Sequence, residues 1–425
     1  MRTILLKLSQ YKLKMSWMTN DDTIIFDGEF NDDLDIELIS GYSKIIFSNY
    51  ELNEKLFEYY SNYELDEKLF EYYTNNVFYA LKYKESKFNH SIYTLPENLT
   101  HLIFGHAFNR CVLELPENLT MIVFGACFNR DITAIPPTIS ELTFGYTIHN
   151  TVFVLPPNLK KLIFGTSFNK NVSDLPYGLT HLTFGSEFNK DVSTLPHTLT
   201  HLTFGVNFNQ NVSNLPQTLT HLIFGNKFNR NVLNLPSTLE YLIFGSEFNK
   251  NVSALPHSLK YLTFGYKFNQ NVSNLPQGIT HLTFGYNFNK NVSNLPQGIT
   301  HLTFGYEFNQ KNDIPLSIKY LKLDSNNQHI INLLPNSIIE LELGIYFILR
   351  MDNLPTSIKK IKINKDNSYY NNDLNCLPNY VEELQLNRAY KKRILNIPKN
   401  LKKIICDVNY PYINDFAMCI VETFI

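Results

Sequence analysis

The 425-residue sequence has few cysteines, a single tryptophan and almost no net charge. Its five cysteines are scattered and none forms a C-x-x-C pair, so the sequence indicates neither a disulfide framework nor a zinc knuckle. We therefore expect reduced thiols and an intracellular protein. The formal net charge of −2 provides no basic surface for nucleic acid and no electrostatic attraction to an anionic membrane.

Long apolar segments and catalytic motifs are also missing. No stretch approaches the roughly 18 apolar residues of a membrane span. Lys7, Lys12 and Lys14 interrupt the apolar character of the first residues, so we expect no signal peptide. The motifs G-x-x-x-x-G-K-[ST], G-x-S-x-G, H-E-x-x-H and G-x-G-x-x-G do not occur. We predict a protein that is not an enzyme and that uses no cofactor.

What the sequence does contain is a repeat of twenty residues. Eleven glycines recur at twenty-residue intervals from Gly105 to Gly305, and sixteen of the 19 prolines follow a leucine or isoleucine. Units that start at each Leu-Pro or Ile-Pro occur eleven times in succession from residue 95. Five looser units begin at residues 314, 334, 354, 377 and 397. A fixed period of this length is the signature of a repeat architecture.

The apolar residues of one unit predict its conformation. In the unit of residues 195–214, apolar side chains occupy positions 1, 5, 8, 10, 14 and 18. This spacing fits neither a sustained helix nor a sustained strand, and it predicts a coil with a short strand of about four residues around positions 8 and 10. Stacked coils pair such strands in parallel, with about 4.8 Å between neighbours. We expect a mainly β solenoid with one parallel sheet and little helix.

Three further positions have backbone roles. Glycine at position 11 ends the strand where a positive φ or a close backbone approach is needed. Asparagine at position 15, as in Asn109 and Asn129, can bond the backbone of a neighbouring coil. Proline at position 2 holds the preceding residue extended and is expected where the chain enters a turn.

The recurrent motif L-P-x-x-L-T-x-L-x-F-G-x-x-F-N resembles the FNIP repeat, a leucine-rich-repeat-like family of giant DNA viruses and social amoebae. The resemblance is close over residues 95–314 and looser from 315 to about 405, and Ile148-His149 replaces Phe-Asn in one unit. It implies a right-handed leucine-rich-repeat-like solenoid that binds proteins. Some family members carry an N-terminal F-box, which joins a ubiquitin ligase, but nothing in the residues before the first degenerate unit reads as an F-box.

The repeats divide the chain into three predicted regions. Residues 1–94 form an N-terminal cap with degenerate repeats, residues 95–314 the regular repeats, and residues 315–425 degenerate repeats with a C-terminal cap. The first region contains a 13-residue segment, residues 48–60, that recurs at residues 61–73. Its apolar and charged spacing favours a short amphipathic helix, while a loop and a docking element remain open.

Two columns of side chains are candidates for an interaction surface. Position 7 is histidine or tyrosine in many units, and position 12 is tyrosine in three consecutive units. The candidate residues are His181, His201, His221, Tyr241, Tyr261, His281 and His301 at position 7, and Tyr266, Tyr286 and Tyr306 at position 12. Tyrosine is frequent in binding hot spots. Stacked histidines are compatible with metal binding or a response to pH, but a solvent-facing repeat position is the simpler interpretation, so we predict no metal site.

These observations predict a non-enzymatic repeat scaffold for protein–protein interaction that acts as an intracellular monomer. If the chain is viral, its compartment is the host cytoplasm and its partners are host proteins. We predict no nucleic-acid partner and no membrane. The alternative is a substrate-receptor component of a ubiquitin ligase that lacks its own F-box.

Overall fold

The structure is a computed structural model. It describes residues 17–20, 23–26, 30–31, 34, 36–47, 87–132, 135–146, 154–311 and 313–424. The duplicated segment at residues 48–60 and 61–73 lies outside the described residues, as does Ile148-His149. The chain forms two compact units, residues 1–210 and residues 211–425.

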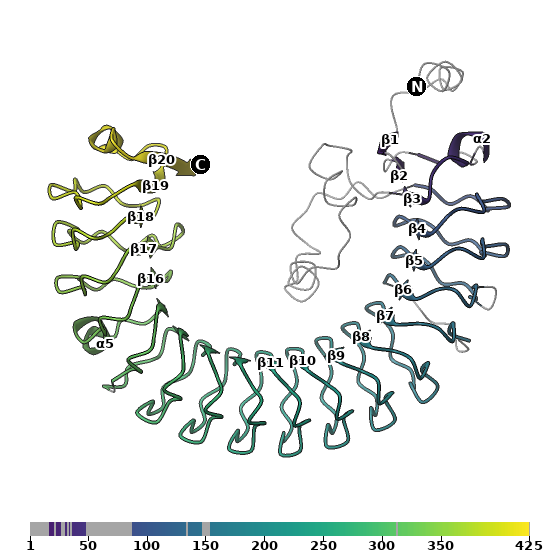
Figure 1. Cartoon of the computed structure of the whole chain (residues 1–425), viewed down its shortest axis with the longest axis horizontal. Helices are drawn as coiled ribbons and strands as arrows, with labels where there is room; N and C mark the ends of the chain where they lie inside the picture. Colours follow the sequence, from purple (N-terminus) through teal and green to yellow (C-terminus); the bar gives the residue numbers. More distant parts are fainter. Residues whose placement is uncertain are drawn as a thin grey trace. The chain divides into compact units, whose positions relative to one another are not determined.

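The first unit is a ladder of short strands (Figure 1). Strand β1 (Trp17–Asn20) pairs antiparallel with β2 (Thr23–Phe26), and β2 pairs in parallel with β3 (Lys44–Phe47). A short helix, α2 (Ile36–Ile39), lies between β2 and β3 in the sequence. The parallel ladder continues through β4 (His101–Ile103), β5 (Met121–Val123), β6 (Glu141–Thr143), β7 (Lys161–Ile163), β8 (His181–Thr183) and β9 (His201–Thr203).

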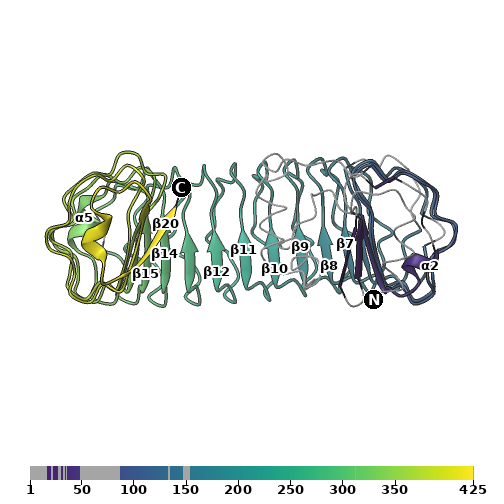
Figure 2. The same cartoon turned by 90° about the horizontal axis from the view of Figure 1, so that it is seen from above.

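The second unit is parallel from its first strand to its last, and Figure 2 shows the arrows of its strands side by side. Its regular coils contribute β10 (His221–Ile223), β11 (Tyr241–Ile243), β12 (Tyr261–Thr263), β13 (His281–Thr283) and β14 (His301–Phe304). The looser units contribute β15 (Tyr320–Leu323), β16 (Glu340–Leu343), β17 (Lys360–Ile363), β18 (Glu383–Gln385) and β19 (Lys403–Asp407), and β20 (Ile420–Phe424) follows. Helix is confined here to α5 (Gln328–Asn332) and the 3₁₀ turn η2 (Ile413–Phe416). The predicted mainly β solenoid with parallel strands is confirmed.

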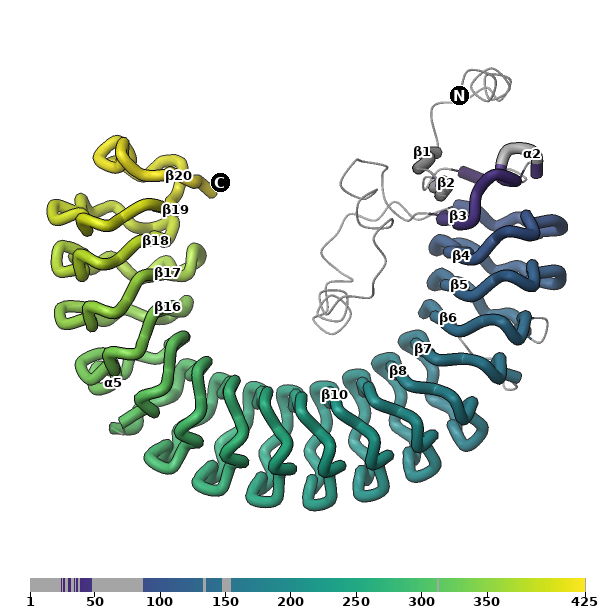
Figure 3. The backbone as a smooth tube through the Cα atoms, in the orientation of Figure 1, coloured from purple at the N-terminus to yellow at the C-terminus, as the bar shows by residue number. Residues whose placement is uncertain are grey.

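Figure 3 shows the successive coils of each unit, and the predicted apolar positions form the core of the regular coils. In the coil of residues 255–274, all six are at most 5% exposed: Leu255, Leu259, Leu262, Phe264, Phe268 and Val272. The rings of Phe264 and Phe268 stack at a centroid distance of 3.7 Å, and Phe264 lies 5.8 Å from Phe284 of the next coil. The core of the regular coils is therefore a continuous stack of phenylalanine rings within each unit.

The strand is shorter than predicted and begins one residue earlier. In most regular coils it covers only positions 7 to 9, for example Tyr261–Thr263. The N–H of Phe264 at position 10 still donates to the carbonyl of Thr283 in the next coil, at 2.9 Å. The regular ladder ends there because the chain turns at the glycine of position 11.

That glycine is required by a close approach between backbones. A Cβ atom on Gly265 would lie closer than 3.0 Å to the carbonyl oxygen of Gly245, and the φ of Gly265 is not in the left-handed region. Of the two predicted reasons for glycine, the close approach is therefore the right one at this position.

Asparagine at position 15 forms the predicted bonds between coils. The N–H of Asn269 donates to Oδ1 of Asn249, the N–H of Asn289 to Oδ1 of Asn269, and the N–H of Asn309 to Oδ1 of Asn289, each at 3.0 Å. This asparagine ladder satisfies backbone donors in the arc, where no strand pairing is available.

One coil of the first unit is interrupted. The rings of Phe47, at the end of β3, and Phe88 stack at 4.0 Å, as Phe104 and Phe108 do at 3.8 Å within a regular coil. The N–H of Asn109 donates to Oδ1 of Asn89 at 3.0 Å, as in the asparagine ladder. Phe47 and Phe88 thus occupy positions 10 and 14 of a single coil, and the chain between them is an insertion at that point.

Candidate interaction surface

Position 7 opens the strand of each regular coil on the side of the sheet away from the core, and from β10 to β15 it carries an aromatic or imidazole ring. Leucine at position 8 is buried, so the side chains at positions 7 and 9 point the other way. Parallel pairing without any shift in register places each position 7 directly beside the next. In the second unit this register builds a ring column, which consists of His221, Tyr241, Tyr261, His281, His301 and Tyr320.

The rings of the column are in contact from end to end. The centroid distances along the six rings, in sequence order, are 5.5, 5.6, 4.3, 4.0 and 5.5 Å. Tyr261 is 41% exposed, His301 is also exposed, and the other four rings are half-buried. The first unit repeats the arrangement on a smaller scale, because His181 and His201 stack at 4.1 Å.

A threonine precedes each histidine of the second unit's column and holds its ring. The hydroxyl oxygens of Thr280 and Thr300 lie 2.9 Å from Nδ1 of His281 and His301, respectively. Each hydroxyl also donates its proton to a carbonyl of the preceding coil, at 3.3 Å. Since a hydroxyl has only one proton, each Nδ1 must be the donor to its threonine, and each Nε2 carries the lone pair.

Both histidines favour the neutral form, because their pKa values are lowered. The pKa of His281 is lowered from its ordinary value by burial and by the neighbouring His301. The pKa of His301 is also lowered, because burial and the positive charge of Lys319 outweigh the opposite effect of Glu340. The centre of the ring column is therefore an uncharged, partly exposed aromatic surface.

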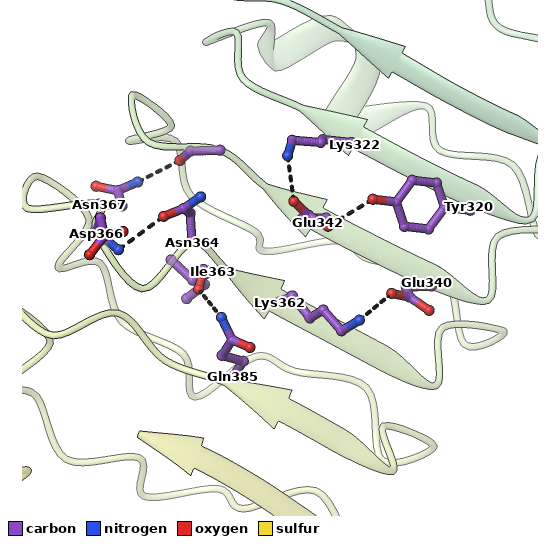
Figure 4. Close-up of polar contacts among 11 residues, drawn as sticks. Tyr320, Lys322, Glu340, Glu342, Lys362, Ile363, Asn364, Asp366, Asn367 and Gln385 are labelled. Atoms are coloured by element: carbon purple, nitrogen blue, oxygen red, sulfur yellow. Dashed lines mark hydrogen bonds and ion pairs between the residues drawn. The ribbon is translucent and has the colours of Figure 1, made fainter. Parts of the chain in front are cut away.

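Beyond Tyr320 the same face of the sheet becomes a lattice of charges that neutralise each other (Figure 4). Glu342 on β16 accepts from Lys322 at 2.6 Å and from the hydroxyl of Tyr320 at 2.7 Å, and Glu340 accepts from Lys362 at 2.7 Å. Burial would raise the pKa of Glu342, but the bonds from Lys322 and Tyr320 outweigh it and hold the pKa below its usual value. Burial and the bond to Glu342 raise the pKa of the Tyr320 hydroxyl.

The tyrosines at position 12 form a second, separate column on the second unit. Tyr266 and Tyr286 stack at 4.8 Å, and Tyr286 and Tyr306 at 5.1 Å. Tyr346 completes this tyrosine column with an edge-on contact to Tyr306 at 5.0 Å. Tyr266, Tyr306 and Tyr346 are 49%, 36% and 41% exposed, respectively.

The structure thus places the candidate residues in separate groups. His221, Tyr241, Tyr261, His281 and His301 share the ring column, and Tyr266, Tyr286 and Tyr306 share the tyrosine column, while His181 and His201 stack in the first unit. Sequence analysis missed Tyr320 and Tyr346. Tyr320 could have been found by counting position 7 from Ile314. Tyr346 could not be found by counting, because it falls at position 13 of its unit, where Ile345 occupies position 12.

Two kinds of feature are absent from the described residues. Among them, no group of three or more histidine, cysteine, aspartate or glutamate side chains is placed to hold a metal ion. No helix in the part of the chain that the structure describes is long and apolar enough to cross a membrane.

Coils with one short parallel strand, a stacked apolar core and an asparagine ladder define a solenoid of the leucine-rich-repeat type. Six matches to the FNIP Repeat profile place the chain in that family: residues 112–147, 171–205, 191–227, 228–267, 268–307 and 308–346. The chain is an FNIP repeat protein. The unmatched residues between 147 and 171 include Ile148-His149, where the Phe-Asn motif is lost.

The chain is also similar to solved structures, of which CroV588 supports the repeat-solenoid fold. CroV588, described as a novel circular LRR protein, is 29% identical, with 96% of this chain and 70% of that chain covered and a TM-score of 0.67. YopM from Yersinia enterocolitica is 16% identical, with 89% and 76% covered and a TM-score of 0.47. The functional domain of InlJ from Listeria monocytogenes is 14% identical, with 59% and 63% covered and a TM-score of 0.40. No curated protein sequence matches the chain.

Proposed function

We propose that this FNIP repeat protein is a non-enzymatic scaffold that binds a protein partner through the ring column of its second unit. The observation that carries the proposal is the run of six rings in contact on adjacent strands, partly exposed and uncharged at its centre. Aromatic side chains supply large contact area at little entropic cost and are enriched in binding hot spots. Leucine-rich-repeat solenoids commonly present such extended surfaces to proteins.

The charge lattice beside the ring column supports this location of the contact. Lys322, Glu340, Glu342 and Lys362 already satisfy one another across strands, so a partner would have to break these pairs to use them. At the centre of the ring column, Tyr261, His281 and His301 contact one another through their rings instead. The tyrosine column is a second surface of the same chemical kind, and we propose it as an additional contact.

The oligomeric state and the cellular location of the protein are part of what we propose. We propose a monomer inside a cell, with host proteins as partners if the chain is viral. The cysteines support a reducing compartment, because none of the five is in a disulfide and Cys111, Cys127 and Cys376 are exposed.

Capture from cell lysate with matched baits tests the proposal. The baits are the wild-type chain, a Tyr241→Ala/Tyr261→Ala variant, a Tyr266→Ala/Tyr286→Ala variant, and a control that removes an exposed tyrosine outside both columns, Tyr369→Ala. We expect at least one protein to bind the wild type and the control equally and to be depleted about tenfold, or about 1.4 kcal/mol, by the ring-column variant.

The outcomes of this capture separate the alternatives. Depletion only by the Tyr266→Ala/Tyr286→Ala variant would move the contact to the tyrosine column, and equal capture by all four baits would refute both surfaces. Recovery of ubiquitin-ligase subunits in a manner that depends on the ring column would support the substrate-receptor alternative instead.

A further inference from the structure

The stacked pair of His281 and His301 is the tightest contact in the ring column. The two residues are directly paired on β13 and β14, their ring centroids are 4.0 Å apart, and their planes differ by only 13°. Two imidazolium cations at this separation repel each other, and a partly buried site screens that repulsion less than bulk water does.

The threonine contacts decide where an added proton goes. Nδ1 of each ring already donates to its own threonine, so protonation takes place at Nε2 of both rings. Each imidazolium charge is shared by the two nitrogens of its ring, so both charges lie on two adjacent, nearly parallel rings.

The surrounding groups offer little compensation for these charges. Tyr261 on β12 lies against His281, with the two ring centroids 4.3 Å apart. The residue before Tyr261 is the cation Lys260. Tyr320 on β15 lies 5.5 Å from His301, and Lys319 precedes it. On β16, Glu340 favours a positive charge on His301 but is already paired with Lys362, and Glu342 is bonded to Lys322 and Tyr320.

We propose that the His281–His301 pair is a proton-operated break in the ring column: with both rings neutral the column is continuous, and with both protonated the two rings separate and the column opens between β13 and β14. Loss of the bound partner in acid follows from this opening, and that consequence rests on the proposed function. The opening itself does not rest on the proposed function, because it is a property of the chain without any partner.

The direction of the pH effect follows from the lowered pKa values of both residues. In the unfolded chain histidine titrates near pH 6.5. In the folded chain burial lowers the pKa of both rings, and His301 further lowers the pKa of His281. The unfolded chain therefore binds these protons more readily as the pH falls below about 6.5, so acidification destabilises the folded second unit.

Nuclear magnetic resonance of the full chain with ¹⁵N-labelled histidine tests the proposal. At pH 8 we expect both residues to show the Nδ1–H tautomer. On acidification both should titrate below pH 6.5, and the ring signals of Tyr261 and Tyr320 should shift at the same midpoint. In a His301→Gln variant, His281 should titrate at a higher pH than in the wild type, while His221→Gln, at the far end of the column, should leave the titration of His281 unchanged.

The resonance results test the opening of the ring column without any binding partner. Three results would overturn the proposal. They are an Nε2–H tautomer in either ring, a His281 titration that is unchanged in His301→Gln, and tyrosine signals that do not shift when the histidines titrate. If the capture experiment yields a ring-column partner, its retention should fall about tenfold between pH 7.5 and pH 5.5 for the wild type, and less for His301→Gln. Failure to capture any partner would refute the proposed function and leave the resonance result intact.

Discussion

Asparagine recurs at several positions of the coil, and its roles at positions 15 and 20 differ. At position 15 its side-chain oxygen accepts a backbone N–H of the next coil, as Asn269 does from Asn289 at 3.0 Å. At position 20 the side chain is exposed, as in Asn294. The residue type alone does not distinguish the two roles, because the distinction depends on which part of the arc faces a neighbouring coil.

The two roles predict different costs of truncation. Asn269→Ala leaves the N–H of Asn289 without its acceptor, so we expect the free energy of unfolding to fall by about 1–3 kcal/mol. The matched change Asn294→Ala, on the exposed position, should stay within about 0.5 kcal/mol of the wild type. Urea unfolding followed by circular dichroism measures both variants. Equal losses would show that the ladder bond contributes nothing specific.

At the scale of the strand, one glycine determines how closely successive coils can stack. The three-residue strands end where position 11 meets the backbone of its neighbour, and this geometry recurs in regular coils of both units. Glycine also occurs at position 4, as in Gly298, where a Cβ would meet its nearest atom at 3.8 Å, an ordinary contact. The stacking of coils therefore depends on glycine at position 11 but not at position 4.

Alanine substitution distinguishes these two glycines. Gly265→Ala forces the coils of Gly245 and Gly265 apart, so we expect a loss of about 3 kcal/mol in the free energy of unfolding. Gly298→Ala should be neutral or should stabilise the chain by up to about 1 kcal/mol, since it only restricts the unfolded backbone. Thermal unfolding compares the two variants. A loss for Gly298→Ala as large as that for Gly265→Ala would contradict the close-approach explanation.

At the scale of the whole molecule, each unit is built from interactions between successive coils. Strand pairs, phenylalanine stacks and ladder bonds in the regular coils join residues twenty positions apart. The coils that begin at Leu275 and Leu295 share the same first twelve residues, LPQGITHLTFGY. Stability in such an array is close to a sum of coil and interface terms.

Removal of one complete coil should therefore be tolerated. Deletion of residues 275–294 brings Asn274 before Leu295, which reproduces the natural junction with Leu275, and pairs β12 with β14 in the same register. We expect a folded chain with an unchanged type of circular dichroism spectrum and a modestly lower melting temperature. Deletion of only residues 275–284 destroys the register and should abolish cooperative unfolding. If both deletions behaved alike, neighbour-by-neighbour stacking would not describe this molecule.

The sequence predicted the structure of the regular coils well, but it did not predict the interrupted coil. The core positions, the asparagine ladder and the parallel pairing were predictable because the twenty-residue period brings equivalent positions side by side. The joining of Phe47 and Phe88 in one coil was not predicted, since an insertion between them conceals their register. Tyr320 and Tyr346 were missed for a related reason, because they lie where the Phe-Gly spacing is lost.

The sequence alone therefore determined the period, the apolar core and the positions that carry rings, since each follows from residue type at a constant spacing. Tertiary structure decided how those rings meet. Contact between His281 and His301, the tautomer that Thr280 and Thr300 impose, and the pairing of Glu342 with Lys322 and Tyr320 all depend on side-chain orientation across strands. A repeat specifies which residues are neighbours, but the packing of those neighbours specifies which atoms touch and hence where a proton or a partner can bind.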